Sequence, residues 1–174
     1  MRAKGISLVE MMAVISIISI LLMLGVPGMS DYLQNSRLRA ISEQLSSDLK
    51  AARVEALNRN RMTTFTVSAT GWSYAVPSAA GFAGYSASPP ELSRSVALAS
   101  NQASVCFDGT GRVLLADCSG PAAALPRFDV QPASGSAACR AGGGTAQCLR
   151  VALSALGQAR VCNPAAAANS LMAC

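Results

Sequence analysis

Residues 4–29 read KGISLVEMMAVISIISILLMLGVPGM, and this stretch decides how the rest of the chain is organised. From residue 6 to residue 29 the only charged side chain is Glu10. At 1.5 Å per residue a helix over these residues is about 36 Å long, which exceeds the ~30 Å hydrocarbon core of a bilayer. Arg2 and Lys4 precede the apolar run, so we expect the N-terminus to stay inside while the rest crosses a membrane once.

Two ordinary explanations of this segment fit poorly. A secretory signal peptide should end at a small-x-small cleavage site, but the apolar run is followed by residues 25–29, GVPGM. A plain membrane anchor leaves Glu10 unexplained, because a carboxylate inside a membrane segment costs on the order of 2.5–3.5 kcal/mol. Glu10 therefore needs a partner and is a candidate functional residue.

The motif in residues 4–10, KGISLVE, resembles the class III signal of type IV pilins and type II secretion pseudopilins. The resemblance implies that a prepilin peptidase cuts between Gly5 and Ile6 and methylates the new N-terminus at Ile6. Glu10 and Pro27 then match the glutamate and the proline of those families, although many members carry phenylalanine where this chain has Ile6. The resemblance also implies a single pass through the inner membrane with the head in the periplasm, followed by transfer to a pilus or pseudopilus filament.

The physical chemistry of the segment agrees with such a role. After cleavage, the amine of Ile6 is a cation in apolar surroundings, and Glu10 of an incoming subunit can pair with the amine of its neighbour. Gly25, Pro27 and Gly28 weaken the helix locally. We therefore divide the chain into a cleaved leader (1–5), a membrane and assembly helix (6–29), an amphipathic helix (30–60) and a β-rich head with disulfides (61–174).

The amphipathic segment should begin at a cap on Ser30 or Asp31 and stop near Asn60. Apolar residues recur there at helical spacing, and charged residues occupy the other positions, which we expect to be solvated. The apolar stripe consists of Leu38, Ile41, Leu45, Leu49, Ala52 and Ala56. The charged face consists of Arg37, Arg39, Glu43, Asp48, Lys50 and Arg53.

After residue 60 the hydrophobic period changes to two, which predicts strands. We place them at residues 63–67, 72–76, 105–107, 112–115, 125–130, 149–153 and 158–162, with loops at 77–90 and 132–147. Trp72 and Tyr74 should be core residues, whereas Phe82 and Tyr85 fit the core and an exposed loop equally well. The predicted fold class is α+β: a long N-terminal helix, membrane-spanning in its first half, packed on an antiparallel β-sheet head as in pilins.

Three further motifs narrow the resemblance to the FimT/FimU and GspH group of minor pilins and pseudopilins. They lie at the end of the helix, in the middle of the head and near the C-terminus. Their sequences are RVEALNRN (53–60), FDGTGR (107–112) and GQARVC (157–162).

Six cysteines and no histidine are present, and all six cysteines lie between Cys106 and Cys174. An even number of cysteines behind an export signal indicates disulfides formed in an oxidising compartment. Of the fifteen pairings that six cysteines allow, we prefer the one that joins sequence neighbours. The preferred pairs are Cys106–Cys118, Cys139–Cys148 and Cys162–Cys174.

No catalytic set is visible in this sequence. The lack of histidine removes the usual general base and a common zinc ligand, and no CxxC pair is present. The glycines of residues 108–111, DGTG, are not followed by the Lys-Ser/Thr of a P-loop and suit a hairpin turn better. We therefore expect no enzymatic activity, no cofactor, no metal and no small-molecule substrate.

Two classes of function remain. The first is structural: a minor pilin that starts or caps a type IV pilus together with other major and minor pilins, or a GspH-type pseudopilin of a type II secretion system. The second is DNA binding for natural transformation, which the FimT branch links to a C-terminal Gly-Arg-x-Arg; here residues 157–160 read GQAR. After Asn60 the head carries seven arginines against four acidic residues, a net +3 spread over more than a hundred residues. Folding could gather Arg140, Arg150 and Arg160 on one edge, but so few cations predict at most weak binding.

Overall fold

The structure is a computed structural model that describes residues 7–77, 84–114, 124–133 and 138–174. The chain forms two compact units, Met1–Leu33 and Gln34–Cys174. Helix α1, Leu8–Arg59, supplies the described part of the first unit and the opening element of the second.

Helix α1 continues through Ser30 and Asp31, so the prediction of a renewed helix with a cap at these residues is wrong. Extending an existing helix needs no new nucleus, so the local weakness at Gly25, Pro27 and Gly28 accompanies a bend between Met23 and Gly28 but does not end the helix. The predicted stop is confirmed: α1 ends at Arg59, and Asn60 adopts a left-handed conformation with φ of +48°.

In the first unit every described side chain from Ser7 to Met23 is exposed, although most of them are apolar. The hydroxyls of Ser16 and Ser19 donate to the carbonyl oxygens of Met12 and Ile15, both at 2.7 Å, so these hydroxyls need no water. Over the residues described, no single helix is long and apolar enough to cross a membrane. The segments Leu8–Met23 and Gly28–Arg59, bent by 44°, meet the criteria of length and composition only as a pair.

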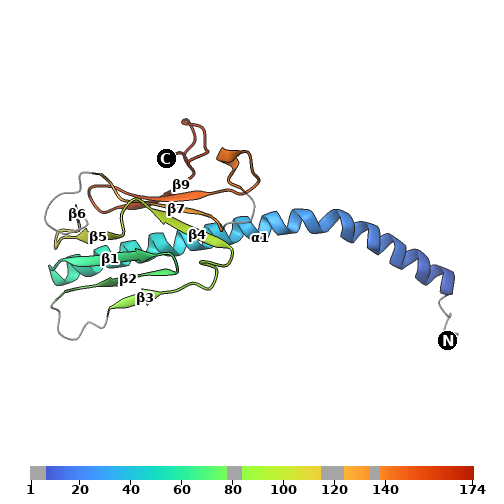
Figure 1. The fold of residues 1–174 in the computed structure, drawn as a ribbon, viewed down its shortest axis with the longest axis horizontal. Helices are drawn as coiled ribbons and strands as arrows, with labels where there is room; N and C mark the ends of the chain where they lie inside the picture. Colours follow the sequence, from blue (N-terminus) through green and yellow to red (C-terminus); the bar gives the residue numbers. More distant parts are fainter. Residues whose placement is uncertain (1–6, 78–83, 115–123, 134–137) are drawn as a thin grey trace, which may run out of the picture. The chain divides into compact units, whose positions relative to one another are not determined.

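The second unit contains two antiparallel sheets rather than the single sheet that the sequence suggested (Figure 1). Sheet A has the order β3-β2-β1-β5-β6, and sheet B has the order β4-β7-β8-β9. The strands of sheet A are β1 (Thr63–Ser68), β2 (Gly71–Ala75), β3 (Tyr85–Ala87), β5 (Ser104–Phe107) and β6 (Val113–Leu114). Those of sheet B are β4 (Val96–Ser100), β7 (Arg127–Pro132), β8 (Leu149–Leu153) and β9 (Ala159–Cys162).

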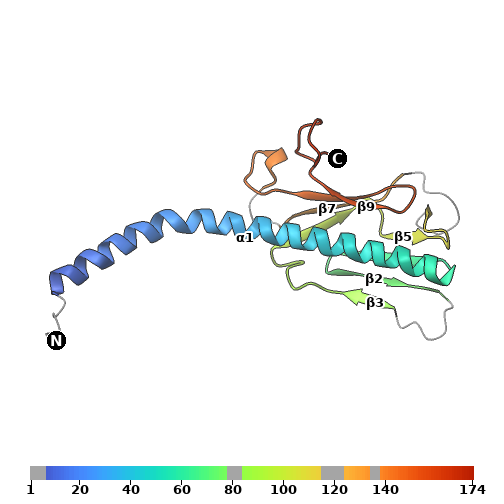
Figure 2. The ribbon, with the colours of Figure 1, turned by 180° about the vertical axis from the view of Figure 1, so that it is seen from behind.

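The C-terminal half of α1 runs alongside both sheets and closes the core (Figure 2). All six residues of the predicted apolar stripe are buried, and they pack with inward-facing residues of both sheets such as Phe65, Phe107 and Phe128. Trp72 is 3% exposed, as predicted for a core residue, whereas Tyr85 is 39% exposed. Phe82 lies outside the described residues.

The charged face of the helix is less solvated than predicted. Asp48 accepts a hydrogen bond from Trp72 Nε1 at 2.7 Å, and Arg53 Nε donates to the carbonyl oxygen of Gly111 at 3.0 Å. Both side chains therefore join α1 to sheet A, because a buried indole N–H and an inward-facing carbonyl each need a polar partner. Arg39 and Glu43 do form an exposed i,i+4 ion pair, as expected of a solvated face.

Every predicted strand corresponds to an observed one, with shifts of one or two residues at the ends. The predicted loops were partly wrong. Residues 77–90 contain β3, and residues 132–147 contain a 3-10 helix, Arg140–Gly142. Strand β4 was missed because its sequence VALAS lacks β-branched and aromatic residues after Val96.

Candidate functional site

The predicted assembly residues lie in the first unit. Gly5 and Ile6 fall outside the described residues. Glu10 is in the first turn of α1, where a carboxylate suits the positive end of the helix dipole, and its side chain is exposed. Within the described part of the chain no cation lies at ion-pair distance from Glu10. A cationic partner for this carboxylate in an apolar environment would therefore have to come from outside these residues.

The three family motifs, distant in sequence, meet at the C-terminal end of α1. Arg53 contacts the turn between β5 and β6 through its hydrogen bond to the carbonyl oxygen of Gly111. The turn between β8 and β9 packs against both Arg53 and Gly111. A Cβ atom on Gly157 would press into the carbonyl oxygen of Gly111 and lie 2.9 Å from Arg53 Cδ. The backbone N–H of Val113 also donates to the carbonyl oxygen of Ala155 at 3.1 Å. These motif residues therefore hold both sheets to the helix.

The turn after β5 is organised by Asp108. Its Oδ1 accepts hydrogen bonds from the backbone N–H and hydroxyl of Thr110 and from the N–H of Arg112, at 2.7–2.9 Å. Burial alone would raise the pKa of Asp108, but these hydrogen bonds and the charge of Arg112 outweigh it, so the pKa lies below its ordinary value. The predicted hairpin turn is confirmed, because β5 and β6 pair on either side of it.

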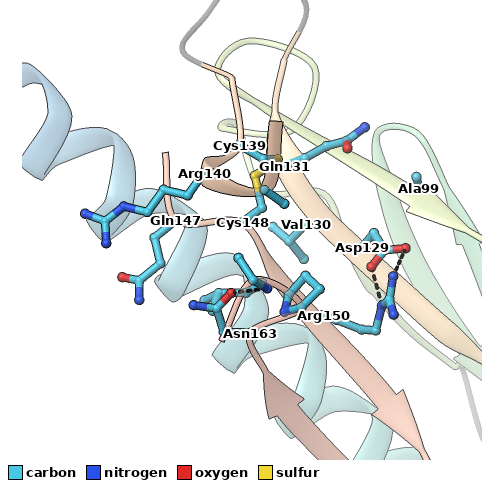
Figure 3. A pocket seen from close by; sticks show the side chains of 14 residues that line it. Ala99, Asp129, Val130, Gln131, Cys139, Arg140, Gln147, Cys148, Arg150 and Asn163 are labelled. Carbon is cyan, nitrogen blue, oxygen red and sulfur yellow. Dashed lines mark hydrogen bonds and ion pairs between the residues drawn. A yellow bond between two sulfur atoms is a disulfide. The ribbon is translucent and has the colours of Figure 1, made fainter. Parts of the chain in front are cut away.

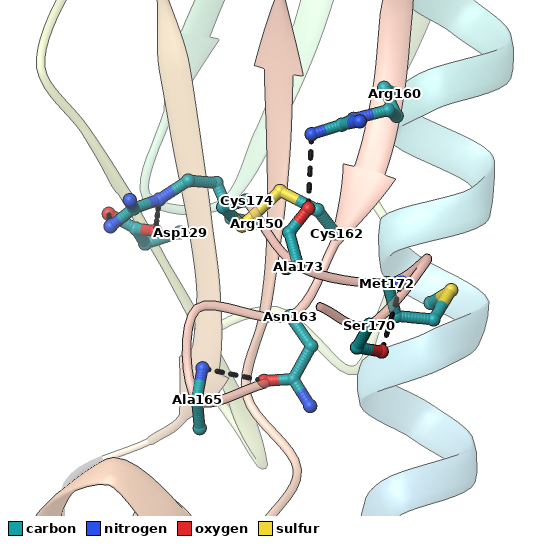
Figure 4. Close-up of a disulfide and its surroundings, with 10 residues drawn as sticks. All are labelled: Asp129, Arg150, Arg160, Cys162, Asn163, Ala165, Ser170, Met172, Ala173 and Cys174. Carbon is teal, nitrogen blue, oxygen red and sulfur yellow. Dashed lines mark hydrogen bonds and ion pairs between the residues drawn. A yellow bond between two sulfur atoms is a disulfide. The ribbon is translucent and has the colours of Figure 1, made fainter. Parts of the chain in front are cut away.

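Two of the expected cysteine pairs are present as disulfides, Cys139–Cys148 and Cys162–Cys174, the second of which is drawn in Figure 4. Cys106 is disulfide-bonded as well. The third predicted pair, Cys106–Cys118, involves Cys118, which lies outside the described residues. No described cysteine is free.

The three arginines proposed for DNA binding are not equivalent. Arg150 forms a bidentate ion pair with Asp129, with Nε–Oδ1 at 2.6 Å and Nη2–Oδ2 at 3.2 Å (Figure 4). The carboxylate of Asp129 therefore balances the charge of Arg150. Arg160 is exposed and donates from Nη2 to the carbonyl oxygen of Ala173 at 3.1 Å, and Arg140 is exposed near Thr145.

Arg127 is a surface cation that sequence reasoning missed. The register across sheet B pairs Arg127 with Ala152 and Ala152 with Arg160. Directly paired residues point to the same face of a sheet, so both arginines project from its outer face. The alternation in β7, where Phe128 and Val130 are buried, could have shown this orientation, but the pairing of the strands could not be read from the sequence.

A cavity of about 300 Å³ opens on the outer face of sheet B (Figure 3). Its walls are the disulfide Cys139–Cys148, the ion pair of Asp129 and Arg150, and the chain around Asn163. The lining is mostly apolar, and Arg140 and Arg150 reach it but Arg160 does not. Across the part of the chain that is described, no three His, Cys, Asp or Glu side chains gather as metal ligands.

A largely apolar N-terminal helix whose described side chains from Ser7 to Met23 are exposed, together with a head of antiparallel sheets packed on a helix, defines a pilin-like protein. The family model of the type II transport protein GspH matches residues 42–157, which is about two thirds of the chain. The chain therefore belongs to the GspH family, within the FimT/FimU–GspH group of type IV minor pilins and pseudopilins. No protein of curated function matches the sequence.

The fold is similar to that of the type IV minor pilin FimU of Pseudomonas aeruginosa strain PAO1 in two crystal forms. The first, in space group P65, has a TM-score of 0.51 and covers 76% of this chain and 98% of that chain. The second, in space group P21, has a TM-score of 0.55 and covers 80% and 98%. Both are 16% identical in sequence, so they show the shared architecture alone.

Proposed function

We propose that this chain is a minor pilin that helps to start or cap a type IV pilus. The observation that carries the proposal is the apolar surface of α1 from Leu8 to Met23, which no described part of the chain covers. Burying each large apolar side chain gains about 1.5–3 kcal/mol, so such a surface demands a bilayer or neighbouring helices. Pilin-like chains use both in turn, the inner membrane before assembly and other major and minor pilins afterwards.

In this proposal the prepilin peptidase cuts between Gly5 and Ile6 and methylates Ile6. Glu10 then pairs with the N-terminal amine of the adjacent subunit, which satisfies both charges away from water. Pro27 lies where the helix can yield during packing, because proline removes one backbone hydrogen bond. The head, residues 61–174 together with the amphipathic helix, stays in the periplasm until the subunit enters the filament.

Removing the chain from its host tests the role. Loss of surface pili, restored by the wild-type chain, supports the proposal. Loss of protein secretion with normal pili would instead identify a GspH-type pseudopilin of a type II secretion system. Normal pili and normal secretion would refute a part in either filament.

A second candidate function, weak DNA binding, is favoured by the charges of the second unit. Four of its described acidic side chains form ion pairs, namely Glu43, Glu55, Glu91 and Asp129, and Asp48 and Asp108 accept hydrogen bonds from uncharged donors. Exposed arginines remain that have no ion-pair partner in the same residues: Arg94, Arg112, Arg127, Arg140 and Arg160. Uncompensated arginines attract polyanions, but so few of them predict a Kd of roughly 10 µM or weaker near physiological salt.

Titration of the full chain in neutral detergent with a labelled DNA duplex tests this second function. Binding that weakens steeply with added salt supports it, because displaced counterions drive such binding. Absence of binding at low salt would remove DNA from the partners of this chain.

A further inference from the structure

We propose that the cavity on the outer face of sheet B receives an apolar side chain of a neighbouring filament subunit, and that Arg140 at its rim pairs with a carboxylate close to that side chain. This inference rests on the minor-pilin function proposed above and names the chemistry of one partner. The face concerned is opposite to the one that packs on α1, because Phe128 belongs to the core whereas Asp129, the next residue of β7, lines the cavity. The contact therefore uses the head and not the apolar N-terminal helix.

The walls of the cavity are fixed by covalent and polar contacts. The disulfide between Cys139 and Cys148 forms one wall. The N–H of Gln147, beside this disulfide, donates to Asn35 Oδ1 on α1 at 2.7 Å. In another wall, Asn163 Oδ1 accepts a hydrogen bond from the N–H of Ala165 at 2.9 Å. A cavity that is formed before binding costs little conformational entropy to fill, which favours docking of a partner.

The cavity and the chain beside it offer apolar surface. Its volume of about 300 Å³ is at the lower end of the range for ligand pockets, which suits one or two side chains. The N–H of Asn163 in its wall donates to the carbonyl oxygen of Met172, so residues 171 and 172 lie next to that wall. Leu171 is 100% exposed and Met172 is 49% exposed, and residues 163–173 include no charged side chain. Apolar surface that extends beyond a cavity is typical of a protein interface, since a small ligand would need only the cavity.

The charges at the cavity favour an acidic partner. Three charged residues line it, Asp129, Arg140 and Arg150. Arg150 donates to both oxygens of Asp129, so this pair is neutral as a whole. Arg140 has no ion-pair partner among the described residues, and the only hydrogen bond of its guanidinium there is a long one, 3.4 Å, to the carbonyl oxygen of Thr145. Two arginines and one aspartate leave a net charge of +1, and Figure 3 shows Arg140 on the side opposite to the ion pair.

The partner must therefore combine an apolar side chain with a nearby Asp or Glu. A guanidinium binds a carboxylate through two parallel hydrogen bonds, which gives such a contact direction as well as strength. Apolar contacts at the centre and a charged contact at the rim are the usual arrangement of a protein interface. A minor subunit has other pilins as its neighbours, so we assign the docking residue to one of them rather than to a second copy of this chain.

The first experiment measures how cavity variants enter filaments, as the ratio of filament to membrane protein in immunoblots of the same cells. Ala165→Trp fills the cavity and should lower this ratio about tenfold, because interfaces depend on a few buried anchors. Ala167→Trp is the matched control, since Ala167 is an exposed alanine of the same segment that does not line the cavity, and it should enter like the wild type. Thermal unfolding of each full chain in neutral detergent, followed by circular dichroism, checks that the head stays folded.

The second experiment tests the charge of Arg140. Arg140→Glu should lower the filament ratio about as much as Ala165→Trp, because it sets a like charge against the carboxylate of the partner. Arg140→Gln keeps hydrogen-bond donors without the charge and should lie between this variant and the wild type. Lys50→Glu, which reverses an exposed charge on α1, is the control and should enter filaments normally.

The third experiment identifies the partner. The photocrosslinker p-benzoylphenylalanine replaces Leu171, and cells are irradiated after filaments have assembled. We expect mass spectrometry to find a crosslink to another pilin, at a peptide with Asp or Glu within a few residues of the linked position. The crosslink should disappear when Arg140→Glu is added and should persist when Lys50→Glu is added.

The outcomes separate this inference from the function on which it rests. If the wild-type chain is absent from filaments, both fall. If the wild type enters filaments and Ala165→Trp or Arg140→Glu enters equally well, docking at the cavity is wrong and the minor-pilin function stands. A crosslink to a second copy of this chain, or to a peptide without an acidic residue, would overturn the assigned partner.

Discussion

Arg53 and Gly111 are 58 residues apart in sequence and are joined by a hydrogen bond of 3.0 Å from Arg53 Nε to the Gly111 carbonyl oxygen. The bond links the last turns of α1 to the turn between β5 and β6, on which the β8–β9 turn also packs. Because all three contributors belong to family motifs, we interpret these motifs as structural. The sequence similarity to minor pilins in these segments therefore reflects contacts that hold the helix and the sheets of the head together.

Arg53→Ala should lower the free energy of unfolding of the full chain by about 1.5–3 kcal/mol, the usual range for a hydrogen bond to a charged group. Denaturant titration followed by Trp72 fluorescence measures the loss. Arg39→Ala, which removes an exposed i,i+4 partner of Glu43, serves as the control and should change the stability little. Equal stability of the Arg53 variant and the control would show that the junction does not depend on this bond.

Gly157→Ala should be more damaging than Gly143→Ala, although both glycines have positive φ, +75° and +81°. An added Cβ at Gly143 meets nothing within 4 Å, so the cost there is the backbone strain of about 1 kcal/mol. At Gly157 the added methyl also presses on the Gly111 carbonyl and Arg53, so we expect an extra loss of about 1–3 kcal/mol. Thermal unfolding of the two variants side by side decides this. Similar losses would contradict close packing of the two turns.

Asp108→Asn should weaken the dependence of stability on acid pH. The hydrogen bonds that Asp108 accepts lower its pKa below the ordinary value of 3.8, so the folded state favours the carboxylate. Its contribution is therefore fully present above pH 3.8 and is lost as the pH falls below that value through the folded-state pKa. Wild type should exceed the variant in stability at neutral pH, and the difference should shrink in acid.

Denaturant titrations at neutral pH and below pH 3.8 give that difference. Thr110→Ala provides an intermediate case, because it removes the hydroxyl donor and leaves both backbone donors in place. A constant difference between wild type and Asp108→Asn across the acid range would mean that the charge of Asp108 contributes nothing to stability.

The sequence predicted the helix and its buried stripe well because periodicity alone encodes them. Leu38 and Ala56, at the two ends of the stripe, are both fully buried. Periodicity does not encode which strands pair, so the division into two sheets and the placing of Arg127 opposite Ala152 could not be predicted. The same limit explains why the contacts of Arg150 and Arg53 were not predicted, since their partners Asp129 and Gly111 come from distant segments.

Non-reducing peptide mapping should recover the pairs Cys139–Cys148 and Cys162–Cys174, and we predict that the third pair is Cys106–Cys118. Short loops between sequence neighbours cost little entropy to close, which favours this arrangement. Removing Cys162–Cys174, with a separation of 12 residues, should lower stability by about 2–4 kcal/mol. Peptides that join Cys106 to any cysteine other than Cys118 would disprove the predicted third pair.

Glu10→Gln should block filament entry while leaving earlier steps intact. The variant keeps the shape of the side chain, so we expect membrane insertion and cleavage between Gly5 and Ile6 to proceed as in the wild type. In the filament the neighbouring amine loses its ion partner, and an unpaired charge in apolar surroundings costs several kcal/mol. Since 1.4 kcal/mol is a factor of ten, incorporation should fall at least about tenfold.

Immunoblots of sheared filaments and of membranes from the same cells measure this ratio, and N-terminal sequencing of the membrane form checks the cut. Glu43→Gln is the matched control, because it neutralises an exposed carboxylate on the same helix and should enter filaments normally. Met1 retained in the wild type would refute processing at Gly5. Normal incorporation of Glu10→Gln, with cleavage intact, would instead show that the charge of Glu10 has no part in assembly and that apolar contacts along α1 suffice.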